Sequence, residues 1–142
     1  MEKLTIKSLD TIKINSGNQK AMILFHGYGA DCSDLAGLTS YIKNNEQFDF
    51  YFPNGILDVP LGFASGRAWF PINMVEYEAA MREGRFRDFQ ATRPEGLDLA
   101  KEHASEFFEA IQPNYDEIYI GGFSQGAMLT TDMLLSQGYK VA

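Results

Sequence analysis

The chain has 142 residues, 45% of them hydrophobic and 22% charged, a composition typical of one folded domain rather than a disordered chain. Twelve Lys and Arg residues against 19 Asp and Glu residues give a net charge of -7, which repels phosphate backbones and argues against nucleic acid as a partner. The single cysteine, Cys32, excludes an intrachain disulfide framework, and the N-terminus lacks the apolar region of a secretory signal. We therefore expect a cytoplasmic protein, and no apolar run is long enough to span a membrane.

Strands are predicted in three segments of the first half of the chain. Residues 4–14 carry β-branched residues at alternating positions, a pattern typical of one or two strands of a half-exposed hairpin. Residues 21–25, AMILF, form a continuous apolar run, as expected of a strand covered on both faces. The run FDFYFP at 48–53 predicts a further strand, which Pro53 ends because proline has no N–H to donate.

Helices and one long loop are predicted around these strands. Leucine and isoleucine recur at helical spacing after Ser33, which predicts a helix over about residues 34–44. Residues 54–72 are rich in Gly, Pro and aromatic residues without a clear period, so we expect a long loop with a functional role. A short helix is indicated around MVEYEAAM within residues 73–93.

The second half of the chain repeats the alternation of helix and strand. Pro94 opens a helix with one apolar stripe, and Pro113 ends it. Residues 116–122, DEIYIGG, predict a strand, residues 124–135 a helix, and residues 139–142, YKVA, the start of one more strand. The whole pattern predicts an α/β fold, with a mostly parallel sheet and flanking helices. The stripe consists of Leu97, Ala100, Ala104, Phe107, Phe108 and Ile111.

A serine between two glycines, Gly122-x-Ser124-x-Gly126, lies where the predicted strand ends and a helix starts. Nucleophilic catalysis uses such a place: small residues allow a strained, tight turn, and the helix N-terminus then points at the reacting oxygen. Ser124 is therefore the candidate nucleophile. The plainer alternative is that Ser124 is an ordinary helix N-cap.

Acyl chemistry also needs backbone N–H groups that meet the tetrahedral oxyanion. One comes from the residue after the nucleophile and the other from a loop after an earlier strand. The sequence FHGYG, directly after the run AMILF, supplies a loop of this kind. We expect the two donors to be the N–H groups of Tyr28 and Gln125.

Four segments, LFHGYGAD, FPNG, RAWF and GGFSQGAM, together resemble the acyl-protein thioesterase and carboxylesterase/phospholipase family of α/β hydrolases. The resemblance runs from about residue 20 to the last residue. It implies an α/β-hydrolase fold and a serine hydrolase whose partner is a small acyl ester or thioester substrate. Ser124 would then be the nucleophile, Tyr28 and Gln125 the oxyanion donors, and Trp69 a residue lining the acyl groove. No cofactor is expected, and no spacing of His, Cys and Asp indicates a metal site.

The sequence departs from this family in the other two members of a catalytic triad. After Ser124 there is one carboxylate, Asp132, and no histidine. Asp132 lies eight residues along the same predicted helix, roughly 12 Å away along its axis, so it is not the triad acid. His26 is expected to have a structural role and His103 to be a surface residue.

We therefore expect residues 1–142 to form a single, partial α/β-hydrolase domain, truncated after the nucleophile helix and weakly active or inactive. Its exposed sheet edge would favour a homo-oligomer. A non-catalytic, hydrolase-like binding module is the alternative.

Other residues have a plain role beside a functional one. Cys32 is expected to be a small buried residue rather than a reactive thiol, and Asp34 to cap a helix rather than to pair with Asp31 in acid–base or metal chemistry. Trp69 and Phe70 are core aromatics or a pocket wall. The arginines at 82, 85 and 87, with Glu83 and Asp88 among them, would form a mixed-charge surface. A flexible acyl-chain lid is a further hypothesis for Met74, Met81, Phe86 and Phe89.

Overall fold

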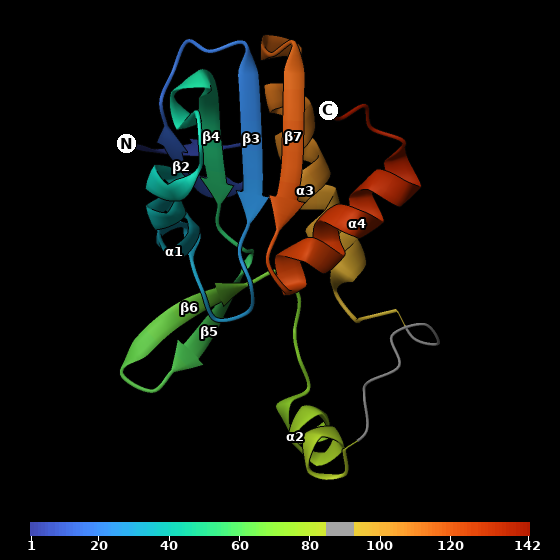
Figure 1. Ribbon diagram of the computed structural model, residues 1–142. Helices are drawn as coiled ribbons and strands as arrows, with labels where there is room; N and C mark the ends of the chain where they lie inside the picture. The colour runs from blue at the N-terminus through green and yellow to red at the C-terminus, as the bar shows by residue number, and fades with distance from the viewer. Residues whose placement is uncertain (85–92) are drawn as a thin grey trace.

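The computed structural model of the chain describes residues 1–84 and 93–142 (Figure 1). A five-stranded sheet with the strand order β1-β2-β4-β3-β7 forms its centre. β3 pairs in parallel with both β4 and β7, whereas the pairs β1–β2 and β2–β4 are antiparallel. The predicted α/β class is confirmed, and the sheet is mixed. The strands are β1 (Glu2–Ile6), β2 (Leu9–Ile14), β3 (Lys20–Phe25), β4 (Phe48–Pro53) and β7 (Glu117–Gly122).

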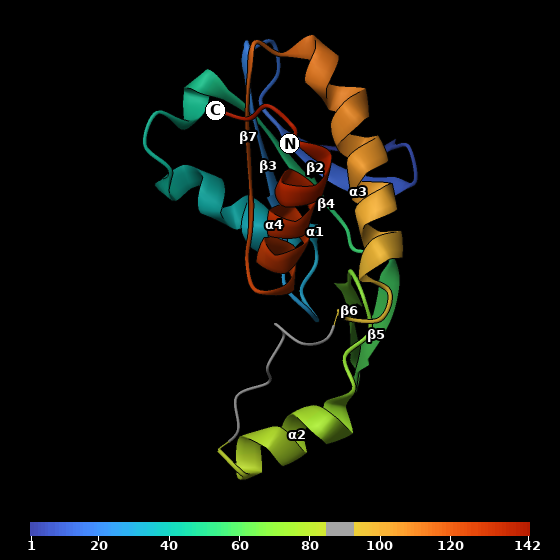
Figure 2. The same ribbon diagram turned by 90° about the vertical axis from the view of Figure 1, so that its right-hand side faces the viewer.

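Helices cover both faces of this sheet. Figure 2 shows α1 (Cys32–Ala36) and α3 (Leu97–Ile111) on opposite sides of the strands. α4 (Gln125–Gln137) lies on the same side as α3, because residues of both helices enter one hydrophobic cluster. α2 (Met74–Arg82) stands away from the sheet in both views and buries none of its residues.

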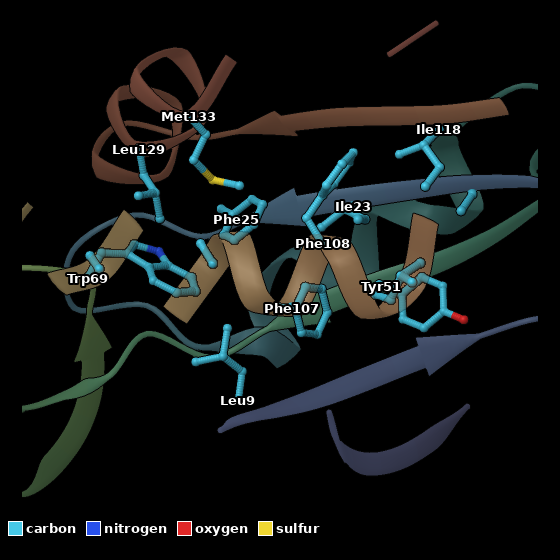
Figure 3. Close-up of a cluster of buried hydrophobic side chains, with 14 of the residues drawn as sticks. Leu9, Ile23, Phe25, Tyr51, Trp69, Phe107, Phe108, Ile118, Leu129 and Met133 are labelled. Carbon is cyan, nitrogen blue, oxygen red and sulfur yellow. The ribbon is translucent and has the colours of Figure 1, made fainter. Parts of the chain in front are cut away.

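The burial of β3 shows why its apolar run is continuous. Ala21, Ile23 and Phe25 are fully buried in the main cluster, which α3 and α4 complete (Figure 3). Met22 and Leu24 point to the other face and pack against the smaller cluster under α1. A strand covered on both faces is therefore confirmed here. The predicted stripe of α3 is also confirmed, since all six of its residues are buried.

Three sequence predictions need correction. Residues 54–72 are not one long loop: β5 (Leu57–Leu61) and β6 (Ala64–Ala68) form a separate antiparallel hairpin around Gly62 and Phe63. No apolar period marks these strands because they pair with each other outside the main sheet, and only Val59, Gly66 and Ala68 are buried. In Figure 1 the hairpin lies beyond the carboxyl end of β3.

The predicted helix over 34–44 is shorter and begins earlier. α1 starts at Cys32 and is followed by a 3-10 helix over Gly37–Tyr41. The hydroxyl of Thr39 donates a hydrogen bond to the carbonyl of Ala36, which favours the tighter turn. The last residues, 139–142, form no strand, although the N–H of Ala142 donates to the carbonyl of Ile118 in β7 at 2.8 Å.

Candidate active site

Ser124 lies at a sharp bend between the end of β7 and the first residue of α4. Its backbone has φ 52° and ψ −114°, a conformation that residues with a side chain rarely adopt and that costs of order 1–3 kcal/mol. Its side chain makes no capping hydrogen bond, and the residue is exposed. The plain N-cap interpretation is therefore not supported by the geometry, since the hydroxyl does not satisfy the helix N-terminus.

The two glycines around Ser124 are sterically required. A β-carbon at Gly122 would lie 2.4 Å from the carbonyl carbon of Gly126, and one at Gly126 would lie 2.2 Å from the carbonyl oxygen of Phe25. The N–H of Phe123 donates to that same Phe25 oxygen at 3.0 Å. The bend is therefore pressed against the end of β3, which leaves no room for any side chain at positions 122 and 126.

The loop after β3 lies beside the same bend. A β-carbon placed on Gly27 would be 3.4 Å from the β-carbon of Ser124. Within residues 1–84 and 93–142, no group accepts a hydrogen bond from the N–H of Tyr28 or of Gln125. Gln125 is the first residue of α4, so its N–H points out of the positive end of the helix. The role of these two N–H groups as oxyanion donors stays a prediction.

His26 holds this loop in place through both ring nitrogens. It is buried, its Nδ1 lies 2.7 Å from the carbonyl oxygen of Gly27, and its Nε2 accepts the N–H of Gly55 at 2.8 Å. The bond from Gly55 requires an unprotonated Nε2, so Nδ1 carries the proton and donates to Gly27. Burial lowers the pKa of this imidazole and keeps it neutral. The structural role expected of His26 is thereby confirmed.

A groove of about 480 Å³ opens at Ser124 and Gln125. Its walls come from residues 70–77, which include the start of α2, from residues 94–95 and from the first turn of α4. Carboxylates of Glu76 and Glu95 also line it, so the groove is apolar with an acidic part. No sequence pattern placed these residues together, because α2 carries no buried stripe. The apolar lining consists of Phe70, Pro71, Ile72, Tyr77, Pro94 and Met128.

Of the two neighbouring aromatics, Phe70 lines the groove and Trp69 does not. Trp69 is fully buried in the main core beside Phe25 (Figure 3), at a ring-centroid distance of 5.0 Å. Its ring also lies 5.4 Å from that of His26, centroid to centroid. Its indole N–H donates to the carbonyl of His26 at 3.0 Å. A direct role of Trp69 in substrate binding stays a prediction, and its position supports the loop next to Ser124.

The two other titratable candidates, Asp132 and His103, do not line the groove at Ser124. Asp132 accepts hydrogen bonds from Arg93 at 2.8 Å and pairs with Lys101 at 3.2 Å, which lowers the pKa of this carboxyl. It joins α4 to α3 and is not placed to act on Ser124. His103 lies on α3 with its Nδ1 2.6 Å from the hydroxyl of Ser8, beside a different cavity.

The plain roles expected near α1 are confirmed. Asp31 and Asp34 form a capping box, in which the carboxylate of Asp31 accepts the N–H of Ser33 and that of Asp34 accepts the N–H of Asp31. Cys32 is buried beneath them, and burial raises the pKa of its thiol. It therefore behaves as a small core residue.

The structure describes only some of the residues named for the acyl-chain lid and the mixed-charge surface. Met74 and Met81 are exposed on α2, and Arg82 pairs with Glu78 at 4.0 Å. The other residues named for the lid and the mixed-charge surface, Arg85, Phe86, Arg87, Asp88 and Phe89, lie outside the described residues.

In the part of the chain with assigned structure, no group of three or more His, Cys, Asp and Glu residues is arranged to hold a metal ion. No helix among the described residues is both long and apolar enough to cross a membrane.

A strand, a strained serine bend and a helix at the carboxyl end of a parallel strand pair define an α/β hydrolase. The chain belongs to the phospholipase/carboxylesterase family, whose sequence model matches residues 8–142. The family expected from the four sequence segments is thereby confirmed.

Solved structures of similar fold agree with this assignment. A phospholipase/carboxylesterase from Dyadobacter fermentans matches with a TM-score of 0.61 at 22% identity, over 97% of this chain and 58% of its own. A carboxylesterase from Mesorhizobium loti matches with a TM-score of 0.63 at 18% identity, over 94% of this chain and 58% of its own. Acyl-protein thioesterase 2 of Zea mays matches with a TM-score of 0.55 at 16% identity, over 87% and 49%. The chain thus spans between about half and three fifths of the length of these proteins.

Proposed function

We propose that this chain carries the nucleophile and the oxyanion site of a serine hydrolase that cleaves carboxylic esters or thioesters through an acyl-serine intermediate. One observation carries the proposal: an exposed serine in a strained bend precedes the unbonded N–H of Gln125, adjoins the Gly27 loop that leads to Tyr28, and lines a largely apolar groove. Membership of the phospholipase/carboxylesterase family supports the same reaction class.

The chemistry follows from these positions. The Ser124 oxygen attacks the carbonyl carbon of the acyl ester, while the N–H groups of Tyr28 and Gln125 donate to the oxygen that becomes negative. Collapse of this intermediate breaks the bond to the alcohol or thiol and leaves the acyl group on Ser124. Water then attacks the acyl-serine and releases the carboxylic acid. The apolar lining of the groove holds the acyl chain.

A base must take the Ser124 proton, and neither histidine of the chain fits this role. Both ring nitrogens of His26 are engaged, and His103 lies beside another cavity. We therefore propose that the base and its carboxylate lie outside residues 1–142. The chain then forms a single partial domain, which agrees with its coverage of the similar structures.

The edge of the sheet at β7 is a candidate surface for self-association. β3 is the only described strand that pairs with β7, so the other edge of β7 is open apart from the bond from Ala142. We propose that the chain self-associates through this edge. We also propose that the protein is cytoplasmic. Sizing the purified chain by light scattering tests the self-association, and a monomer at all concentrations contradicts it.

Acylation of Ser124 tests the catalytic proposal directly. Oxyanion stabilisation and binding alone retain about 10³–10⁴-fold acceleration over water when a triad member is missing. We expect p-nitrophenyl acetate to acylate Ser124 slowly, and peptide mass spectrometry to locate the acyl group there. Ser124→Ala should abolish the reaction, whereas Ser136→Ala, on the exposed end of α4, should not change it. Equal release of p-nitrophenol by wild type and Ser124→Ala would contradict the proposal.

A non-catalytic binding module is the second candidate, and it is favoured because neither histidine, both within the described residues, is placed to act as a base on Ser124. In that case the groove would bind a fatty acid or acyl ester without turning it over. Ser124→Ala would then bind a fluorescent fatty acid as tightly as wild type, and no acyl-serine would form. The reading frame after codon 142 also separates the two candidates, since the enzyme needs a later aspartate or glutamate and a histidine.

A further inference from the structure

The side chain of Gln125 is used for something other than oxyanion binding. It is buried, with 2% of its surface exposed, although it follows the exposed Ser124. Its Oε1 accepts the backbone N–H of Trp69 at 2.9 Å, and its Nε2 donates to the carbonyl of Phe70 at 2.6 Å. One amide therefore bonds the donor and the acceptor of two consecutive residues in a segment more than fifty positions earlier in the chain.

The segment that Gln125 holds is a wall of the groove. Phe70 lines the groove. Trp69 anchors the same segment in the core, because its indole N–H donates to the carbonyl of His26. His26 in turn belongs to the loop that leads to Tyr28. The groove wall, the loop and the bend are thus joined by hydrogen bonds in which both ends of the Gln125 amide take part.

We propose that the Gln125 side chain is a positioning residue that locks the 69–70 segment against the serine bend, so that the groove and the oxyanion donors keep one relative placement. Its catalytic consequence rests on the proposed function, whereas its structural consequence does not. If the lock is lost, the acyl chain and the oxyanion are no longer held at a fixed separation.

The chemistry of the amide explains why glutamine fits this position. It presents an acceptor and a donor at the end of one side chain, which match an N–H and a carbonyl of neighbouring residues. Methionine has a similar length and neither strong group, so both the Trp69 N–H and the Phe70 carbonyl would be buried without partners. An ionised glutamate keeps the acceptor and loses the donor. A neutral glutamic acid restores both.

Trp69 is the single tryptophan of the chain, so its fluorescence reports on the lock directly. In Gln125→Met we expect its emission to shift to longer wavelength and hydrogen exchange of the 69–70 amides to accelerate. Acylation of Ser124 by p-nitrophenyl acetate should slow by roughly tenfold, as expected when reacting groups are misplaced. Gln137→Met, an exposed position on the same helix, is the matched control and should leave all three readouts unchanged.

Gln125→Glu gives a readout that general loss of stability would not produce. As the pH falls and the introduced carboxylate becomes neutral, the emission of Trp69 and the acylation rate should both return toward wild type. Gln125→Met should show no such return. The wild-type protein is titrated in parallel, which separates the contribution of His26.

Three outcomes decide the inference. Trp69 emission and amide exchange in Gln125→Met that match those of Gln137→Met would overturn it. If circular dichroism shows that Gln125→Met is unfolded, the titration of Gln125→Glu decides instead, and a lack of recovery at low pH overturns it. If wild type shows no acyl-serine, the proposed function fails, and the fluorescence and exchange results still decide whether Gln125 is the lock.

Discussion

Gly126 lies against the backbone of Phe25 so closely that a β-carbon at position 126 would be 2.2 Å from the Phe25 carbonyl oxygen. This contact joins the first turn of α4 to the end of β3. It brings the bend at Ser124 next to the loop that follows β3 and leads to Tyr28. The small residue at position 126 is therefore a condition of the site's geometry.

Gly126→Ala should lower the free energy of unfolding by about 2–3 kcal/mol, because the added methyl group meets backbone atoms that cannot move aside. Urea denaturation measures the change. Gly37→Ala is the control, since a β-carbon there meets nothing within 4 Å and the residue has φ −62°. That substitution should be neutral or stabilising by up to about 1 kcal/mol. Equal losses in both variants would show that the close contact at Gly126 is not the cause.

Ser124→Gly should raise the free energy of unfolding by about 1 kcal/mol while it removes the proposed nucleophile. Glycine adopts φ 52° without the steric cost that serine has there, and this gain exceeds the entropy that glycine loses. Thermal unfolding checks the change. Ser136→Gly, within α4, should have the opposite sign and cost about 0.5–1 kcal/mol. A destabilised Ser124→Gly variant would mean that the bend is not strained.

Asp132→Asn should lower stability at neutral pH by about 0.5–1.5 kcal/mol without affecting acylation of Ser124. Hydrogen bonds from Arg93, with help from Lys101, hold the pKa of Asp132 below its ordinary value of 3.8. A depressed folded-state pKa stabilises the fold above the ordinary value and loses that contribution as the pH falls through the folded-state value. The difference between wild type and Asp132→Asn should therefore close below about pH 3.8.

Urea titrations of both proteins across this range measure that difference. Glu106→Gln, an exposed carboxylate on α3, is the control and should lower stability at neutral pH less than Asp132→Asn does. Loss of acylation in Asp132→Asn would instead point to a role at the active site.

Protonation of His26 should destabilise the fold in mildly acidic solution. Burial, the largest influence, holds its pKa below the ordinary value of 6.5, and Arg67 lowers it further, whereas the Gly27 carbonyl, Asp31 and Asp34 act in the opposite direction. The unfolded chain therefore takes up the proton first, so stability is full above pH 6.5 and falls as the pH drops toward the folded-state value. Protonation would also break the bond from Gly55 to Nε2.

The two histidines of the chain supply the test. The fall in unfolding free energy between pH 7 and pH 5 should persist in His103→Asn and disappear in His26→Asn, measured relative to each variant's value at about pH 7. A fall of equal size in both variants would assign the effect to other groups.

Much of the fold and of the site could be predicted from local patterns. The bend at Ser124 depends on a strand, two glycines and a helix that follow one another, so the motif and its flanks suffice to predict it. The hairpin of β1 and β2, the two-sided burial of β3 and the stripe of α3 depend on periods of two and 3.6 residues. The hairpin of β5 and β6 could not be predicted in this way, because only Val59, Gly66 and Ala68 of its strands are buried and they form no apolar period.

The sequence by itself determined the class of fold and the strained bend at Ser124, since each depends on residues adjacent in the chain or on a repeating period. Only the tertiary structure decided which aromatic lines the groove, what Asp132 binds and what the buried amide of Gln125 holds. Trp69 and Phe70 reach Gln125 across more than fifty residues, and Arg93 reaches Asp132 across 39. Contacts over such separations are set by how the helices and the sheet pack, and no local period records them.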